Sequence, residues 1–319
     1  MSVLNKRKSK LNQSIVQKAD DYLKMRKHQL KPSTYGIYRH YIDSYIAPHF
    51  EEAKLKKLTA EAIQEFVNGC SEKGLSPSTI AAIFFFLRNS LKSAYEIDIF
   101  QIKLPKQIHK KIEVLSIKEQ KFLEIIAKST DESTYIGIIL SLYCGLRIGE
   151  LCGLLWNDVD FEKRLIFVRR TLQRIKNIDS DAPTKTKVTS LLPKSESSQR
   201  NIPLPDFLYV LLDDFKQKSG MTASYVLSID GKCIEPRIMQ FRFKKLLLKA
   251  EMRSVNFHIL RHTFATRALE NGFDIKTLSE ILGHSSAAFT MKRYAHTLDE
   301  HKRIRMESLT ALYQQSAIS

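Results

Sequence analysis

Six residues in the second half of the chain could together perform chemistry on a phosphate ester. In chain order they are Arg147, Lys194, His258, Arg261, His284 and Tyr294. A guanidinium binds two phosphate oxygens at once and cannot lose its charge. Two such groups would stabilise the charge that collects on the non-bridging oxygens during attack on phosphorus, each by about 3–4 kcal/mol. The set therefore predicts attack on a phosphodiester without a metal ion.

The late tyrosine, Tyr294, is the candidate nucleophile. Its hydroxyl has an ordinary pKa of about 10, so it needs a neighbouring base or a strongly positive pocket. Histidines such as His258 and His284 are suited to that proton exchange. Lys194, on a mobile hairpin, would protonate the departing 5′ oxygen. A tyrosyl ester keeps the strand end attached, so the break can be resealed without ATP.

Each residue taken alone also has a purely structural interpretation. Arg147 could be a partner of Glu150, and Lys194 one solvated lysine among many. The pair His258 and Arg261 shares a helix face, but such pairs are common on solvated helices. His284 could cap a helix, and Tyr294 could pack in the core. Only the combination favours catalysis.

The elements that must position these residues are mostly helices. Residues 13–100 are predicted to be wholly helical, and their high basic content fits a helical DNA clamp, with a solvated basic surface as an equal alternative. In the larger part, Ser116 and Glu119 form a capping box, and Gly145 ends a helix. Strands are predicted at 164–170 and 200–205, joined by a long, polar, mobile connection.

The expected fold class is mainly α with a small antiparallel β-sheet, in a two-domain DNA-clamp architecture. The predicted segments are a basic tail at 1–12, a helical core-DNA-binding domain at 13–102, a linker at 103–112, a catalytic domain at 113–295 and a tail helix at 296–319.

Composition limits the partners. The net charge of +17 favours a polyanion, with nucleic acid ahead of an anionic membrane surface. There is no apolar run of about 18 residues and no signal-peptide pattern, which predicts a cytoplasmic protein. The four cysteines form no CxxC pair, so they are expected to be free buried thiols. Neither a zinc ligand set nor a nucleotide-binding loop is present, so no metal or cofactor is expected.

The segments GLRIGEL, HILRHTFAT and LGHSSAAFTMKRYAH resemble the tyrosine recombinase, or phage integrase, family, which includes lambda integrase, Cre and the Xer recombinases. The resemblance implies that Arg147 and Arg261 bind the phosphate. It assigns His258 and His284 to acid–base and hydrogen-bonding roles. Tyr294 would form a 3′-phosphotyrosyl link. Further matches are Glu150, expected to support the first arginine, and His262 and Thr263, expected to be supporting residues at most.

The lysine is chosen by the pattern LPKSESSQRNIPL, which selects Lys194, with Lys185 and Lys187 as rivals. The C-terminal tail either packs on its own domain or, as often in the family, docks on a neighbouring protomer in a cyclic tetramer. A monomer that assembles on DNA is expected. The chain lacks room for an arm-binding domain, which hints at simpler sites.

The predicted function is site-specific DNA recombination, with integration and excision of a mobile element favoured and resolution of chromosome dimers left open as the other task. The partners would be double-stranded recombination sites and possible accessory proteins for DNA bending or directionality. A type IB topoisomerase-like enzyme and a non-catalytic DNA-binding protein are the alternatives. Simple binding needs no nucleophile beside two arginines, which argues against the binder.

Overall fold

The computed structural model describes residues 13–51, 53–92, 102–107, 112–177, 184, 186–191, 198–219, 224–294, 306–307 and 310. The predicted tail at 1–12 and most of the predicted tail helix at 296–319 lie outside these residues. The chain divides into an N-terminal unit, Met1–Lys110 with Ile175–Lys187, and a C-terminal unit, Lys111–Arg174 with Val188–Ser319.

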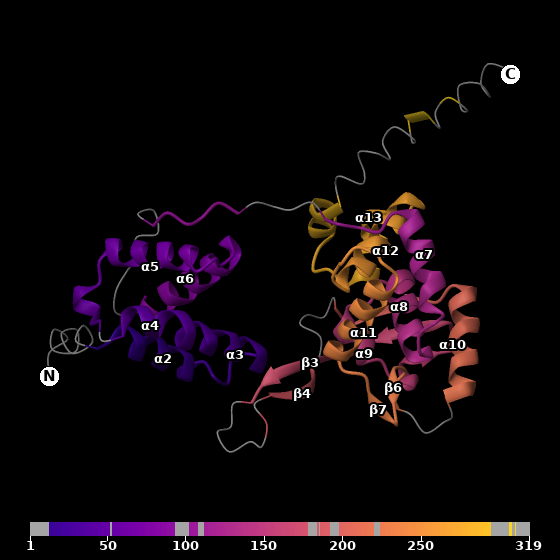
Figure 1. Cartoon of the computed structure of the whole chain (residues 1–319), viewed down its shortest axis with the longest axis horizontal. Coiled ribbons are helices and arrows are strands. Elements are labelled where there is room, and N and C mark those ends of the chain that lie inside the picture. The colour runs from indigo at the N-terminus through magenta and orange to yellow at the C-terminus, as the bar shows by residue number, and fades with distance from the viewer. Residues whose placement is uncertain are drawn as a thin grey trace. The chain divides into compact units, whose positions relative to one another are not determined.

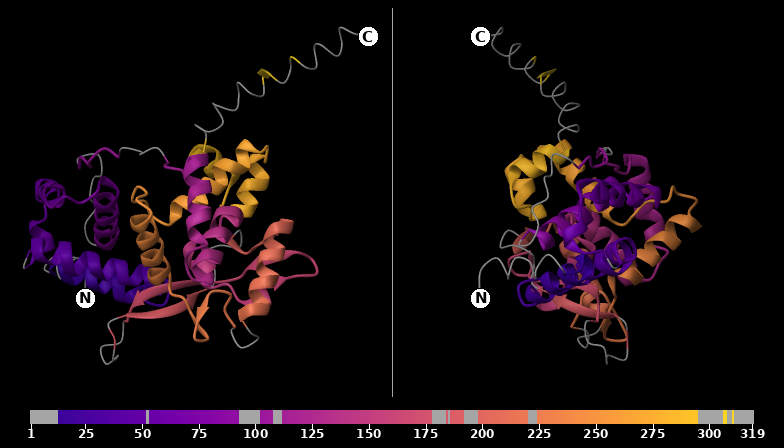
Figure 2. Two further views of the ribbon diagram at one scale, coloured as in Figure 1. Left: turned by 45° about the vertical axis from the view of Figure 1, so that its right-hand side comes forward. Right: turned by 90° about the vertical axis from the view of Figure 1, so that its left-hand side faces the viewer.

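The N-terminal unit is built from helices, drawn in indigo to violet in Figure 2. Side-chain oxygens of Ser14, Thr59 and Ser76 accept hydrogen bonds from the first turns and so fix three helix starts. The helices are α2 (Ile15–Met25), α3 (Pro32–Tyr41) with a π-helical continuation (Ile42–Ile46), α4 (Ala47–Phe50), α5 (Ala60–Glu72) and α6 (Pro77–Leu91). Their apolar faces enclose one core, to which the buried α6 contributes most.

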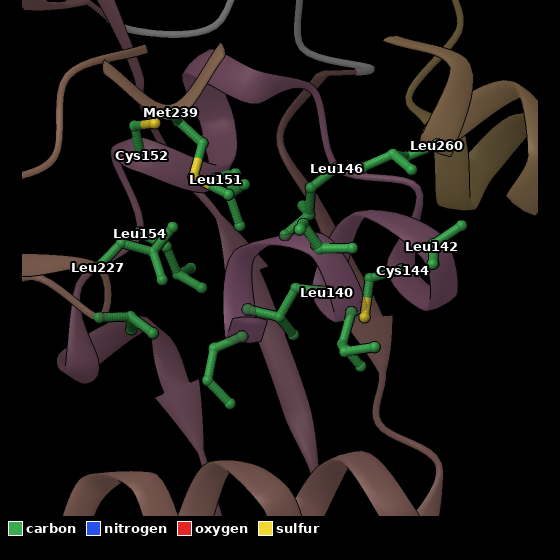
Figure 3. Packing of buried hydrophobic residues seen from close by; sticks show 14 of the residues in the cluster. Leu140, Leu142, Cys144, Leu146, Leu151, Cys152, Leu154, Leu227, Met239 and Leu260 are labelled. Atoms are coloured by element: carbon green, nitrogen blue, oxygen red, sulfur yellow. The ribbon is translucent and has the colours of Figure 1, made fainter. Parts of the chain in front are cut away.

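The C-terminal unit is organised around α8 (Glu132–Cys144), which is buried on nearly all sides. In Figure 1 the neighbouring helices surround α8, and Leu140, Leu151 and Met239 meet in the core shown in Figure 3. The surrounding helices are α7 (Ile117–Ala127), α9 (Ile148–Cys152), α10 (Asp206–Ser219), α11 (Pro236–Lys249), α12 (His258–Glu270) and α13 (Ile275–Leu282).

Local signals place the ends of these helices as predicted. Ser116 and Glu119 form the expected capping box at the start of α7. Helix α8 ends at Gly145, whose φ of +61° is the left-handed conformation that favours glycine. The chain then turns sharply into α9, which places Arg147 at the junction of the two helices.

The predicted strand pair is confirmed, but the β structure is more extensive than expected. Strand β2 (Leu165–Val168) lies between β1 (Val159–Asp160) and β5 (Arg200–Pro203) in an antiparallel sheet, with Ile166 opposite Ile202. Two further two-stranded sheets accompany the small antiparallel sheet that was expected. They are β3 (Thr171–Lys176) with β4 (Thr186–Leu191), and β6 (Ser228–Ile229) with β7 (Lys232–Cys233).

The connection between β2 and β5 was predicted to be long, polar and mobile with a hairpin around Lys194, and in the structure it contains the strands β3 and β4. Buried or half-buried apolar residues, such as Leu172, Ile175 and Val188, recur among its polar residues. Such half-buried patterns suit a β-ribbon.

Two predictions from composition can be compared with the described residues. None of the helices they form is long and apolar enough to cross a membrane. All four cysteines are free, as predicted. Cys70, Cys144 and Cys152 are buried, but Cys233 is only half-buried, so the prediction of burial was wrong for that residue.

Candidate active site

Arg147 immediately precedes α9. It is held by hydrogen bonds to Glu150 of α9 and to Gly283 at the end of α13. Its Nη1 donates to Glu150 Oε1 at 2.7 Å, and its backbone N–H donates to Glu150 Oε2 at 3.0 Å. Its Nη2 donates to the carbonyl oxygen of Gly283 at 3.1 Å. The Arg147 side chain keeps 36% of its surface exposed, so the guanidinium is fixed in direction and still accessible.

Glu150 is shared between two guanidiniums. Besides Arg147, it accepts from Arg200 Nη2 at 2.9 Å and from Arg200 Nη1 at 3.1 Å. Burial alone would raise the pKa of Glu150, but the charges of Arg200 and Arg147 outweigh it and lower that pKa to about 2. The carboxylate therefore stays ionised and fixes the guanidinium of Arg147.

Arg261 is the most deeply buried of the arginines in the predicted set, with 2% of its surface exposed. Its Nη1 and Nη2 each donate at 2.6 Å to a main-chain oxygen, those of Gly145 and Leu282. Burial and the charge of Arg147 lower the pKa of Arg261 to about 9, which still leaves it protonated at neutral pH. Its partners are neutral carbonyls, so the positive charge is not cancelled locally.

His284 completes this group, and its neighbours fix its tautomer. Arg261 Nη2 lies 3.0 Å from His284 Nε2, and a guanidinium can only donate, so Nε2 accepts. The ring hydrogen is then on Nδ1, which donates to Oγ1 of buried Thr290 at 2.7 Å. Burial and the nearby arginines lower the pKa of His284 to about 3, which keeps the ring neutral.

The two histidines of α12 lie one helical turn apart. The rings of His258 and His262 have centroids 4.5 Å apart and meet at 86°. Burial and the charges of Arg261, Arg293 and Arg147 lower the pKa of His258 to about 4. His258 is exposed at the surface, whereas His262 is half-buried.

Tyr294 is the last described residue of a helical run, residues 287–294, and is 1% exposed. Its hydroxyl forms a 2.9 Å hydrogen bond with Nδ1 of His262. Burial raises the pKa of Tyr294, while the charges of Arg261, Arg293 and Arg147 act in the opposite direction. The tyrosine therefore belongs to the same electrostatic environment as the arginines.

Of the three candidate lysines, only Lys187 is among the described residues. Lys194 and its rival Lys185 lie outside the described residues, and Lys187 is an exposed residue of β4.

Thr263 is buried and accepts a hydrogen bond from the Leu115 backbone N–H at 3.0 Å, a contact that anchors the segment before α7.

Sequence reasoning missed one buried arginine, Arg200 on β5. Its side chain is 5% exposed, and besides Glu150 it donates to the carbonyl oxygens of Ile281 and Ser198. Arg200 and the buried Ile202 occupy alternate positions of β5 and so share one face. This is the only local sign of such a role. Its partners come from residues that are distant in the sequence.

Five predicted residues thus share one electrostatic site, built from the turn after α8, the start of α12, the end of α13 and residue 294. Hydrogen bonds join Arg147, Arg261 and His284 to that turn and to the end of α13, and the charges of Arg147 and Arg261 act on His258 and Tyr294. Within the described residues, no group of three or more His, Cys, Asp or Glu is placed to hold a metal ion. A pocket of clustered cations with a buried phenol is suited to attack on a phosphodiester.

Family comparison agrees with this chemistry. Residues 115–301 match the model of the phage integrase family, and residues 15–71 match that of the phage integrase N-terminal SAM-like domain. A tyrosine recombinase XerC-like protein of Caldanaerobacter subterraneus subsp. tengcongensis is 30% identical over 313 residues, covering 89% of this chain and 79% of that protein. The tyrosine recombinase XerA of Thermococcus onnurineus is 27% identical over 284 residues, covering 86% and 89%.

Solved structures share the fold. The Tn1549 transposon integrase in complex with transposon right end DNA superposes with a TM-score of 0.76 at 24% identity, covering 93% of this chain and all of that one. A lambda integrase dimer bound to a core site gives 0.67 at 17% identity, covering 92% and 81%.

The fold and the matches define a DNA strand-cutting and rejoining enzyme. The chain belongs to the phage integrase family of tyrosine recombinases, as its sequence motifs predicted.

Proposed function

We propose that the candidate active site cuts and rejoins DNA by transesterification, with Tyr294 as the nucleophile. The observation that supports this most strongly is the bonding of Arg147 and Arg261 to adjacent main-chain oxygens, at Gly283 and Leu282. Neutral main-chain oxygens hold Arg261, while Arg147 is held by one such oxygen together with the carboxylate of Glu150. Two guanidiniums held in this way are preorganised for the trigonal-bipyramidal phosphorus of the transition state.

In the proposed step, Tyr294 Oη bonds to phosphorus and the bond from phosphorus to the 5′ oxygen breaks. Arg147 and Arg261 bind the non-bridging oxygens, and His258 and His284 supply acid–base and hydrogen-bonding groups. The Tyr294 hydroxyl proton passes to a histidine of the site, and Lys194 protonates the leaving oxygen. Glu150 and Arg200 hold Arg147 in position. The 3′-phosphotyrosyl bond retains the energy of the broken ester, so attack by a 5′ hydroxyl reseals the strand.

The substrate would be a pair of double-stranded recombination sites, and the active assembly a homotetramer formed on DNA. Two comparisons support this. The Tn1549 integrase was solved with transposon end DNA, and a lambda integrase tetramer was solved bound to a Holliday junction. The task would be integration and excision of a mobile element in the cytoplasm at the nucleoid, with accessory proteins for DNA bending or directionality.

The test uses duplexes that the protein itself selects from a random-sequence pool, each with a single nick placed so that the short 5′-hydroxyl fragment diffuses away. Wild type should accumulate a covalent protein–DNA band in denaturing gels. Tyr294→Phe should form none, whereas Tyr209→Phe on α10 should behave as wild type. Arg147→Ala and Arg261→Ala should each lose about 10²–10³-fold or more in cleavage rate while still binding DNA.

Absence of the band from wild type at every nick position would favour a DNA-binding protein without strand cleavage. A band that persists in Tyr294→Phe would remove Tyr294 as the nucleophile.

A further inference from the structure

A second histidine of α12, His262, contacts the hydroxyl of the proposed nucleophile directly. His262 Nδ1 lies 2.9 Å from Tyr294 Oη, with the ring centroids 5.9 Å apart. Within the described part of the chain, His262 is the one hydrogen-bond partner found for this 1%-exposed tyrosine. A buried hydroxyl is held by its partner, and in the tautomer with the ring hydrogen on Nε2 the acceptor Nδ1 sets the direction of the O–H bond.

His258, the acid–base residue of the family motif, occupies a different place. Its ring packs edge-to-face on the ring of His262, 4.5 Å away, and no hydrogen bond from His258 to Tyr294 is found among the described residues. The three rings form a series from exposed His258, through half-buried His262, to buried Tyr294. His262, the middle ring of the three, contacts the hydroxyl oxygen of Tyr294.

We propose that His262 orients the Tyr294 hydroxyl and accepts its proton when the oxygen bonds to phosphorus. This inference rests on the proposed role of Tyr294 as nucleophile. The Oη–H bond breaks as its proton moves to His262 Nδ1, and the Oη–P bond forms. The bond from phosphorus to the 5′ oxygen then breaks, and that oxygen takes a proton from Lys194. On resealing each transfer reverses, and Oη regains its proton from His262.

The electrostatic surroundings agree with this role. Burial, His258, Arg293 and Arg261 lower the pKa of His262 to about 3, so the ring is neutral at physiological pH and one of its nitrogens carries a lone pair. Arg293 Nη2 lies 3.5 Å from Nε2, a long contact, and acceptance of the proton at Nδ1 uses the tautomer whose ring hydrogen is on Nε2. Among the described residues, the charged or titratable groups that face the ring are His258, Arg293, Arg261 and Tyr294. A phosphodiester bound by Arg147 and Arg261 would place a negative charge beside them. That charge offsets the cations and increases the basicity of the ring when substrate is present.

The test compares His262→Ala with His262→Asn. The Asn side chain places an amide near the position of Nδ1, so it can hold the hydroxyl but cannot take its proton. Single-turnover cleavage is measured on the nicked duplex and on a duplex with sulfur in place of the 5′ bridging oxygen. A thiolate leaves without protonation, so the sulfur substrate corrects defects in leaving-group protonation alone.

His262→Ala should cut about 10²–10⁴-fold more slowly than wild type on both substrates, with DNA affinity unchanged. The cleavage rate of His262→Asn should lie between the rates of wild type and His262→Ala. Lys194→Ala should regain its rate on the sulfur substrate. The rates of both His262 variants should rise with pH towards the tyrosine's own ionisation, above its ordinary pKa of about 10, whereas wild type levels off earlier. His28→Ala, an exposed histidine of the N-terminal unit, is the matched control.

Wild-type cleavage by His262→Ala would overturn the inference, and so would recovery of both His262 variants on the sulfur substrate. If the Ala variant fails to fold, as judged by DNA binding, the Asn variant decides through its pH profile. An active Tyr294→Phe would refute the proposed function itself. An inactive Tyr294→Phe beside a normal His262→Ala would refute only the inference about His262.

Discussion

At the scale of single residues, the site depends on cations whose charge is preserved. Arg147 and Arg261 bond largely to carbonyl oxygens, and the one carboxylate among them, Glu150, is shared with Arg200. One negative charge therefore serves two of the three guanidiniums. The cluster keeps a net positive charge, which a phosphate group can neutralise.

Arg200 should be a positioning residue for Arg147, acting through Glu150. Arg200→Gln removes the charge opposite a buried carboxylate and leaves the Ile281 carbonyl without its donor, which should cost about 3–5 kcal/mol in stability. Arg200→Lys keeps the charge but loses the two-pronged contact, so it should be milder. Thermal unfolding and single-turnover cleavage, measured where each variant is folded, check this prediction.

A matched control is Arg170→Gln, which breaks another salt bridge to a buried carboxylate, Asp158, in the same unit. It should lower thermal stability without a specific loss of cleavage. Equal cleavage by folded Arg200→Gln and wild type would show that Arg200 contributes to stability alone.

The sequence predicted the residues with local or motif signatures and missed those defined by distant contacts. Arg147, Arg261 and Tyr294 stand in recognisable motifs. Arg200 does not, because its partners Glu150 and Ile281 are 50 and 81 positions away. The family motif includes His262, but its contact with Tyr294 spans 31 intervening residues and depends on how helix 287–294 packs.

At the scale of elements, the ends of helices position the site. The carbonyl oxygens that bind the arginines belong to the turn after α8 and to the end of α13. Both helices stop at a left-handed glycine, Gly145 with φ +61° and Gly283 with φ +63°. Helix ends leave carbonyls without intrahelical partners, and these oxygens become acceptors for the guanidiniums.

Gly145→Ala should therefore impair both stability and catalysis. The left-handed conformation costs a non-glycine residue about 1–2 kcal/mol. The new Cβ would also lie 2.5 Å from Phe264 Cδ1 and 3.0 Å from Leu282 Cδ2, an overpacking that adds about 1–3 kcal/mol. The melting temperature should fall and cleavage should slow, because the carbonyl that binds Arg261 moves.

Gly231→Ala separates the cost of a left-handed non-glycine residue from the cost of overpacking. Gly231 has φ +74°, but no atom lies within 4 Å of the point that an added methyl group would occupy, so only the conformational cost applies. If both variants lost the same stability and neither changed cleavage, the close packing around Gly145 would have no functional consequence.

Helix ends were predictable from the sequence because capping is local. The Ser116–Glu119 box and the Gly145 stop occur where the residues indicated them. A hairpin around Lys194 was expected, but the bounds and pairing of β3 and β4 were not predictable, because residues 171–199 are polar in composition. Strand pairing is a non-local property that composition does not encode.

At the scale of the whole molecule, the net charge of +17 is the dominant property. Most basic residues lie outside the candidate active site, where they are available for contacts with DNA phosphates, which carry no sequence information directly. Binding should therefore have a large electrostatic component over the whole bound length of DNA, on which the site chemistry is superimposed.

DNA affinity should fall steeply with salt. A protein with about 6–10 phosphate contacts loses about 10³–10⁵-fold in affinity between about 50 and 200 mM salt. Fluorescence anisotropy over a salt series measures the slope, which Arg147→Ala should reduce by about one. Affinity that is insensitive to salt would mean that the excess of lysine and arginine serves another purpose.

The use of main-chain oxygens to hold the guanidiniums has a consequence for tolerated variation. Every amino acid possesses a carbonyl, so no particular functional group is required at 145, 282 or 283 for this purpose. A saturation mutagenesis survey should find these positions restricted by dihedral angle and by volume. Within this set of contacts, chemical identity should matter only at Arg147 and Arg261, whose guanidiniums these carbonyl oxygens bind.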